Sequence, residues 1–153
     1  MPTVLIDTML LTLFVVGTAS SEYIHMHRRL RPYTRIDFDL LVENVSRASA
    51  IVVTPNTLTE TSDWAKMIAE PARSHIAATL QDFIGVFDER YVASNAAALD
   101  IDFPRLWLTD SGILRELANG HVLLTSDTQL YVAALQRGFQ ALNFDHLRSW
   151  RFK

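Results

Sequence analysis

Short apolar runs alternate with longer segments of helical periodicity along most of this chain. Val4–Ile6 is an apolar run that stops at an acid, and residues 8–16 then continue as a mostly apolar helix candidate. Residues 35–46 carry apolar side chains at helical spacing, and residues 50–53 form a β-branched run that ends at Thr54. Alternation of this kind, without hairpin turns, favours a mostly parallel sheet with helices on both faces. The sequence therefore predicts an α/β fold.

The same alternation continues through the second half of the chain. We expect helices over residues 55–69, 72–83, 90–99, 109–119 and 126–137, and strands over residues 121–125 and 139–144. Pro104 predicts a loop over residues 100–107, because proline disrupts the interior of a helix. Thr54 and Thr109 are the expected N-caps of their helices. No linker or repeat divides the chain, so residues 1–153 are expected to form a single domain.

Composition narrows the class of protein further. A hydrophobic share of 49% and a charged share of 20% are typical of a globular chain that buries a core. The absence of cysteine excludes a disulfide-stapled scaffold and a thiolate zinc site, and it favours a reducing, cytoplasmic location. The apolar start of the chain is similar to a secretory signal, but Asp7 interrupts it and no basic residue precedes Arg28. We therefore expect neither a signal peptide nor a membrane span.

Four acidic residues occupy positions where such a fold places ligands. Asp7 and Asp127 each follow a predicted strand, and ligands bind outside the carboxyl ends of parallel strands. Glu60 lies at the edge of the apolar stripe of its helix, and Asp110 heads a helix whose apolar stripe faces the core. Taken singly, each has an ordinary explanation: a helix cap for the first two, solvent exposure for Glu60, and a favourable interaction with the helix dipole for Asp110.

Taken together, the four acids suit a divalent cation. Mg²⁺ and Mn²⁺ bind carboxylate oxygens, and crowded carboxylates repel one another unless a cation or proton intervenes. Such a cluster suits in-line hydrolysis of a phosphodiester bond by metal-activated water. Asp63, three residues after Glu60, is a secondary candidate. The net charge of −3 does not exclude a polyanionic substrate, because the rest of the chain carries 14 basic residues against 13 acidic ones.

Four segments resemble, in their order and spacing, the PIN-domain family of metal-dependent ribonucleases. They are VLIDTMLL, VVTPNTLTE, LTDSGIL and LLTSDTQLYVAALQRG. This resemblance extends over nearly the whole chain and implies a three-layer α/β/α sandwich in which Asp7, Glu60, Asp110 and Asp127 bind Mg²⁺ or Mn²⁺. It also implies that Thr125 or Ser126 helps to hold metal or water. The chain departs from the family at Met9, where many members have Asn, and this departure bears on activity and metal affinity.

The resemblance implies an endoribonuclease whose products carry a 5′-phosphate and a 3′-hydroxyl. Many small members of the family are toxins of toxin–antitoxin pairs and are commonly dimeric. The resemblance alone therefore implies a protein antitoxin and a homodimer. The alternative is a PIN-like module that binds RNA or protein but has lost efficient catalysis, which Met9 favours. A phosphatase of the haloacid-dehalogenase type is disfavoured, because it needs a second acid where Met9 stands.

Residues 23–35 form a basic and aromatic segment, YIHMHRRLRPYTR, with four arginines, two tyrosines and no acid. Guanidinium groups bind phosphate and tyrosine rings stack on bases, so Arg28, Arg29 and Arg31 are the candidate RNA-binding residues. The alternative is a solvated connection in which the arginines pair with the acids of residues 37–43.

Overall fold

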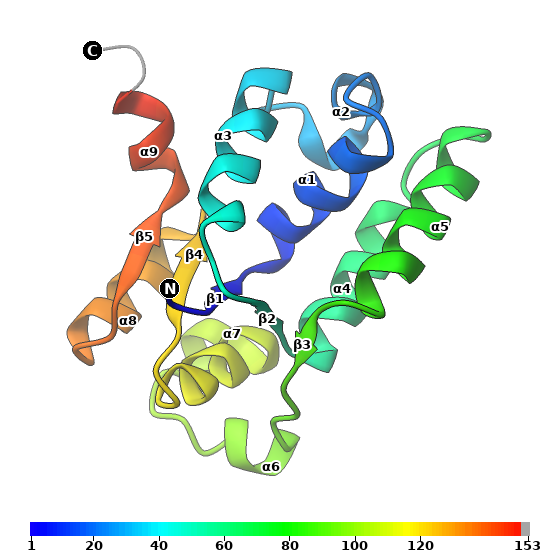
Figure 1. The fold of residues 1–153 in the computed structure, drawn as a ribbon. Coiled ribbons are helices and arrows are strands. Elements are labelled where there is room, and N and C mark those ends of the chain that lie inside the picture. The colour runs from blue at the N-terminus through cyan, green and yellow to red at the C-terminus, as the bar shows by residue number, and fades with distance from the viewer. Residues whose placement is uncertain (151–153) are drawn as a thin grey trace.

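The computed structural model describes residues 1–150 and contains a five-stranded parallel sheet (Figure 1). The strands are β1 (Val4–Ile6), β2 (Ile51–Val53), β3 (Asp88–Glu89), β4 (Val122–Thr125) and β5 (Ala141–Asn143), and they lie side by side in the order β3-β2-β1-β4-β5. Every pair of neighbouring strands is parallel, and Leu5 in the central strand lies opposite Val52 and Leu123. The predicted α/β class with its parallel sheet is confirmed.

Helices follow the strands and cover both faces of the sheet. They are α1 (Thr8–Ala19), α2 (Tyr23–Met26), α3 (Arg35–Ser46), α4 (Pro55–Ala65), α5 (Ala72–Ile84), α6 (Ser94–Ala97), α7 (Phe103–Leu117), α8 (Thr128–Gln136) and α9 (Phe144–Trp150), with a short 3-10 helix η1 (Arg28–Leu30) after α2. Val4 and Ile6 pack into the core that holds α1, α3 and α5, whereas Leu5 packs against α7 and α8. This alternation, which follows from the period of a strand, divides the molecule into three layers.

The helix α1 lies deepest in the molecule and begins at the end of the central strand. Most of its side chains are buried, and it packs against α3, α4 and α5 (Figure 1). Such a helix is apolar on nearly every side because it has neighbours on nearly every side. None of the helices within residues 1–150 combines the length and apolar character that a membrane span needs.

The helix after β2 begins as predicted but ends early. Thr54 caps α4 by accepting a hydrogen bond from the Thr57 amide at 3.2 Å, and Pro55 occupies the first helical position. The sequence predicts a helix through residue 69, but α4 ends at Ala65. The buried His27 side chain donates to the Ala65 carbonyl at 3.2 Å, which satisfies a terminal carbonyl that a longer helix would otherwise use.

Three predictions in the middle of the chain are wrong in whole or in part. The helix predicted over residues 90–99 shrinks to α6, because the Arg90 amide donates to the Val53 carbonyl and the chain there extends the pairing of β2 with β3. Residues 100–102 are non-helical as predicted, but residues 103–107 of the predicted loop instead begin α7, since Pro104 lies in the first helical turn, where proline needs no amide partner. Thr109, predicted to be an N-cap, lies within α7.

Candidate functional site

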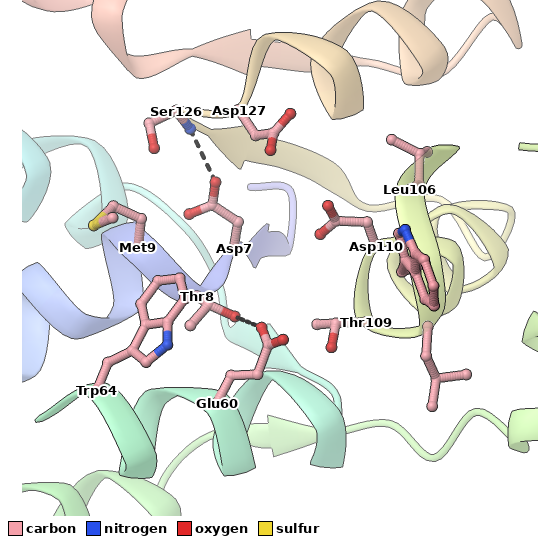
Figure 2. A pocket seen from close by; sticks show the side chains of 12 residues that line it. Asp7, Thr8, Met9, Glu60, Trp64, Leu106, Thr109, Asp110, Ser126 and Asp127 are labelled. Atoms are coloured by element: carbon pink, nitrogen blue, oxygen red, sulfur yellow. Dashed lines mark hydrogen bonds between the residues drawn. The ribbon is translucent and has the colours of Figure 1, made fainter. Parts of the chain in front are cut away.

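The acidic residues predicted from the sequence line one pocket of about 580 Å³. It lies at the carboxyl ends of the neighbouring strands β1 and β4. From β1 the chain continues to β2 and β3 on one side of the sheet, whereas β4 and β5 lie on the other side, so the strand order reverses between β1 and β4. Such a reversal of strand order opens a crevice at the edge of a parallel sheet. Its lining residues are Asp7, Thr8, Met9, Glu60, Trp64, Leu106, Trp107, Leu108, Thr109, Asp110, Ser126 and Asp127. Figure 2 shows the carboxyl groups of the four acids around one opening.

Asp7 is the most firmly held of the four carboxylates. One of its oxygens caps α1 by accepting from the Leu10 amide at 3.0 Å. Its other oxygen accepts from the Ser126 amide at 2.9 Å and from the Thr125 hydroxyl group, which ties the end of β1 to the end of β4. Burial raises the pKa of Asp7, although these three hydrogen bonds oppose the shift. The carboxylate is therefore both a structural link and a wall of the pocket.

Glu60 enters the pocket from α4. Its carboxylate accepts a hydrogen bond from the Thr8 hydroxyl at 2.7 Å, and Thr8 is the first residue of α1 (Figure 2). The side chain is half-buried at the edge of the apolar face of its helix, as the sequence pattern predicts. Trp64 follows one helical turn later and lines the same pocket, because residues four apart share a helix face.

Asp127 and Asp110 complete the acidic lining. Asp127 caps α8 with one oxygen, which accepts from the Leu130 amide at 2.9 Å. Asp110 is half-buried on α7, and its carboxylate accepts no hydrogen bond from any described residue. Burial, together with the negative charges of Asp127, Asp7 and Glu60, raises the pKa of Asp110 to about 7. The pocket thus concentrates negative charge that nothing within it neutralises.

The pocket has the chemistry of a hard-cation site without a preformed cage. Carboxylate oxygens are the donors that Mg²⁺ and Mn²⁺ prefer, and a cation would relieve the repulsion that raises the Asp110 pKa. Across residues 1–150, no group of three or more His, Cys, Asp or Glu side chains is arranged closely enough to hold a metal ion. The four residues are of the donor type and charge that a divalent cation takes, but the structure does not bring three of them into coordinating range.

The supporting residues predicted from the sequence occupy different places. Ser126 lines the pocket, whereas Thr125 is fully buried and donates to Asp7, so both help to fix that carboxylate. Asp63 does not line the pocket, because it lies on an exposed face of α4 and contacts Lys66 at 3.5 Å.

Thr8, Trp64 and Trp107 are among the pocket residues that the sequence analysis missed. Thr8 holds Glu60, and its position directly after Asp7 was the available signal. Trp64 stands one turn after Glu60 on the same helix, which was a second usable signal. Trp107 has a non-helical backbone inside α7, with φ 64° and ψ −167°, and no local pattern predicts that conformation.

The basic segment of residues 23–35 reaches the wall of this pocket through one of its arginines, Arg29. The exposed residues Arg28, Arg29, Arg31 and Arg35 form no ion pair with any residue that the structure describes. Two of the three acids proposed as alternative partners are engaged elsewhere, since Arg148 binds Asp37 and Arg47 binds Glu43. The third, Asp39, forms no ion pair within residues 1–150. The Arg29 guanidinium lies 4.4 Å from the centroid of the Trp64 ring, which joins the segment to the pocket wall.

The sequence matches no protein-family model and no curated protein. The interpretation of the pocket therefore depends on its own residues and on the resemblance described above.

Proposed function

We propose that the protein is an endoribonuclease that hydrolyses RNA phosphodiester bonds with Mg²⁺ or Mn²⁺. The observation that carries the proposal is that four carboxylates from separate segments of the chain line one pocket at the strand-order reversal. A structural role explains the caps made by Asp7 and Asp127, but it does not explain why Glu60 and Asp110 face the same space. The resemblance to the PIN-domain family supports the same function and implies 5′-phosphate and 3′-hydroxyl products.

Each carboxylate has a distinct part in this proposal. Asp7 is oriented before any ligand arrives, because three hydrogen bonds fix its two oxygens. Glu60 is oriented by Thr8, and Asp127 keeps one oxygen free of its helix cap. Asp110, whose pKa is about 7, holds a proton for part of the time near neutral pH and releases it when positive charge enters the pocket. A bound divalent cation would supply activation of water and neutralisation of the phosphate.

The surroundings of the pocket favour a polyanionic substrate. A phosphodiester is repelled by four carboxylates, so its approach needs positive charge close by. Arg29 supplies positive charge at the pocket wall through its contact with Trp64, and the other exposed arginines of residues 28–35 lie close to it in the sequence. Arginine binds phosphate oxygens through two parallel hydrogen bonds, which suits it to hold the RNA backbone.

The second candidate is an RNA-binding module with weak catalysis. Met9, a residue of the pocket wall, favours it, because a thioether is a poor ligand for a hard cation. A pure binding module would bind RNA equally well with and without chelator. The two candidates therefore differ in whether divalent metal changes what the protein does to RNA.

The test is a cleavage assay on a panel of single-stranded and structured RNAs with Mg²⁺, with Mn²⁺ and with chelator. We expect cutting that requires metal, with the rate falling at least about 100-fold in Asp7→Asn, because one fixed carboxylate carries several kcal/mol of the stabilisation that a catalytic metal provides. Analysis of the product ends should give 5′-phosphates.

The matched control is Asp63→Asn, which makes the same chemical change on an exposed face of α4. Its cleavage rate should equal that of the wild type. Cutting that survives chelation, or that Asp63→Asn reduces as much as Asp7→Asn does, would contradict the assignment of this pocket. Chelator-insensitive RNA binding without any cutting would favour the binding module.

A further inference from the structure

The most strained residue of the pocket wall is also its most exposed aromatic residue. Trp107 has φ 64° and ψ −167°, a region of backbone conformation that essentially only glycine populates without cost. Its side chain is 70% exposed, so burial of the indole contributes little free energy to offset the backbone strain. Among residues 1–150 it is the one non-glycine residue with a positive φ. Strain of this kind, held at a pocket wall, is typical of functional positions.

A second indole lines the same pocket from a different element. Trp64 comes from α4, whereas Trp107 comes from α7, and these two helices contact each other. Trp64 is half-buried and carries the unpaired guanidinium of Arg29 at 4.4 Å from its ring centroid. The acidic pocket is thus bounded by two flat aromatic faces, one of which adjoins positive charge.

We propose that Trp107 and Trp64 stack on unpaired bases and so position a single strand beside the carboxylates, with Trp107 as the specificity-determining residue. Indoles stack on every base, and the backbone phosphates between stacked bases need cations such as Arg29. A base inside a duplex has no free face, so this wall selects unpaired nucleotides. The inference rests on the proposed function, since it names how the RNA of that reaction is held.

The strain at Trp107 fits this assignment better than a purely structural one. Next to the kink, Leu106 is buried in the core, where its side chain is 7% exposed. Any residue at position 107 that accepts this backbone conformation would leave Leu106 in the same place. Glycine accepts it without strain. Tryptophan is therefore the costly choice for the fold, and its indole makes only one described ring contact, with Phe103 at 6.2 Å between centroids.

The test measures equilibrium binding of a fluorescein-labelled single-stranded RNA 12-mer and of the matching duplex, by anisotropy, at low salt with chelator. We expect Trp107→Ala to weaken single-strand binding about tenfold and to leave duplex binding unchanged. Trp107→Phe should stay within about threefold of the wild type, because a phenyl ring still stacks. Trp107→Gly should lose as much affinity as Trp107→Ala, yet its Tm should be no lower than that of the wild type.

The matched control is Trp150→Ala, because Trp150 is 75% exposed and lies outside the pocket. Its affinity for the single strand should equal that of the wild type. The proposal is overturned if Trp107→Ala binds the single strand normally, if Trp107→Phe loses as much as Trp107→Ala, or if Trp150→Ala has the same effect. A fall in the Tm of Trp107→Gly that matches its loss of affinity would assign the effect to folding and also overturn it.

These outcomes are separate from the fate of the nuclease proposal. Binding through Trp107 by a protein that never cuts RNA would overturn the nuclease and leave the stacking residue in place. Metal-dependent cutting by a protein whose RNA affinity does not change in Trp107→Ala would support the nuclease and overturn the stacking role of Trp107. A protein that binds no RNA at all would overturn both.

Discussion

Asp110→Asn is expected to raise the stability of the metal-free protein while abolishing its metal-dependent cleavage. Burial, followed by the charges of Asp127, Asp7 and Glu60, raises the pKa of Asp110 to about 7, which means that the ionised carboxyl group opposes folding. Asparagine has the same shape without the charge. Because Asp110 accepts no hydrogen bond from any described residue, the substitution breaks none. We expect a gain on the order of 2 kcal/mol at pH 8, or about 4 to 8 °C in Tm.

The gain should depend on pH in a defined direction. The pKa of Asp110 is about 7 in the folded protein and 3.8 as the ordinary value for an aspartate. Above pH 7 the folded protein bears the full cost of the charge. As the pH falls through 7 toward 4, the folded state takes up the proton first and the cost is relieved. The difference in Tm between Asp110→Asn and the wild type should therefore be largest above pH 7 and shrink toward pH 4.

Divalent metal should reverse this ranking. A cation that binds the folded state stabilises it by mass action, so adding Mn²⁺ should raise the Tm of the wild type more than that of Asp110→Asn. Asp63→Asn is the control, since Asp63 is exposed and its contact with Lys66 contributes little to stability. Thermal unfolding in chelator and in Mn²⁺, from pH 5 to pH 8, measures all of these effects. A lower Tm for Asp110→Asn in chelator at pH 8 would contradict the clustered-charge description of the pocket.

The sheet could be predicted because its strands carry their signal locally. Val4–Ile6 and Val122–Thr125 are short apolar runs that end in polar residues, and both are buried strands in the structure. The edge strand β3 could not be predicted, because Asp88 and Glu89 have no apolar pattern and pair with β2 only through their backbone. A strand of two residues is defined by its neighbour and not by its own side chains.

Where helices begin and end was less predictable than where they exist. The early end of α4 depends on His27, which lies 38 residues away from Ala65 in the sequence. The kink at Trp107 likewise depends on how α7 packs, because its own residues favour no left-handed backbone. Tertiary contacts determine the end of α4 and the kink in α7, so the hydrophobic periodicity of the sequence alone does not predict them.

The positions of Asp7 and Asp127 at the pocket were predictable because a helix cap that follows a strand lies at the edge of the sheet. Asp7 and Asp127 cap helices, as the local pattern indicates, but a cap uses only one carboxylate oxygen. The other oxygen of each residue is available to the neighbouring strand or to the pocket. A capping role therefore does not exclude the proposed ligand-binding role, since the strand-to-helix junction that needs a cap is also the edge of the sheet where ligands bind.

Replacing Arg28, Arg29 and Arg31 together by Ala should weaken binding of single-stranded RNA by about 10-fold to 100-fold at low salt. These exposed guanidinium groups have no ion-pair partner within residues 1–150, so they are available to phosphates. Each phosphate contact on a single strand contributes about 0.7 to the slope of log affinity against log salt. The triple variant should therefore lose about 2 units of that slope. Anisotropy titrations at a series of salt concentrations, in chelator, measure both quantities.

A matched triple variant separates local binding from net charge. Arg47, Arg73 and Arg90 are also exposed, but each lies within 3.2 Å of its own carboxylate partner. Replacing these three by Ala changes the net charge by the same amount, yet it should leave the salt slope nearly unchanged, because the carboxylate beside each guanidinium already offsets its charge. If both triple variants lose the same affinity and slope, the effect belongs to the overall charge of the protein. If neither does, residues 28–31 are a solvated connection, and the path of the RNA to the carboxylates lies elsewhere on the molecule.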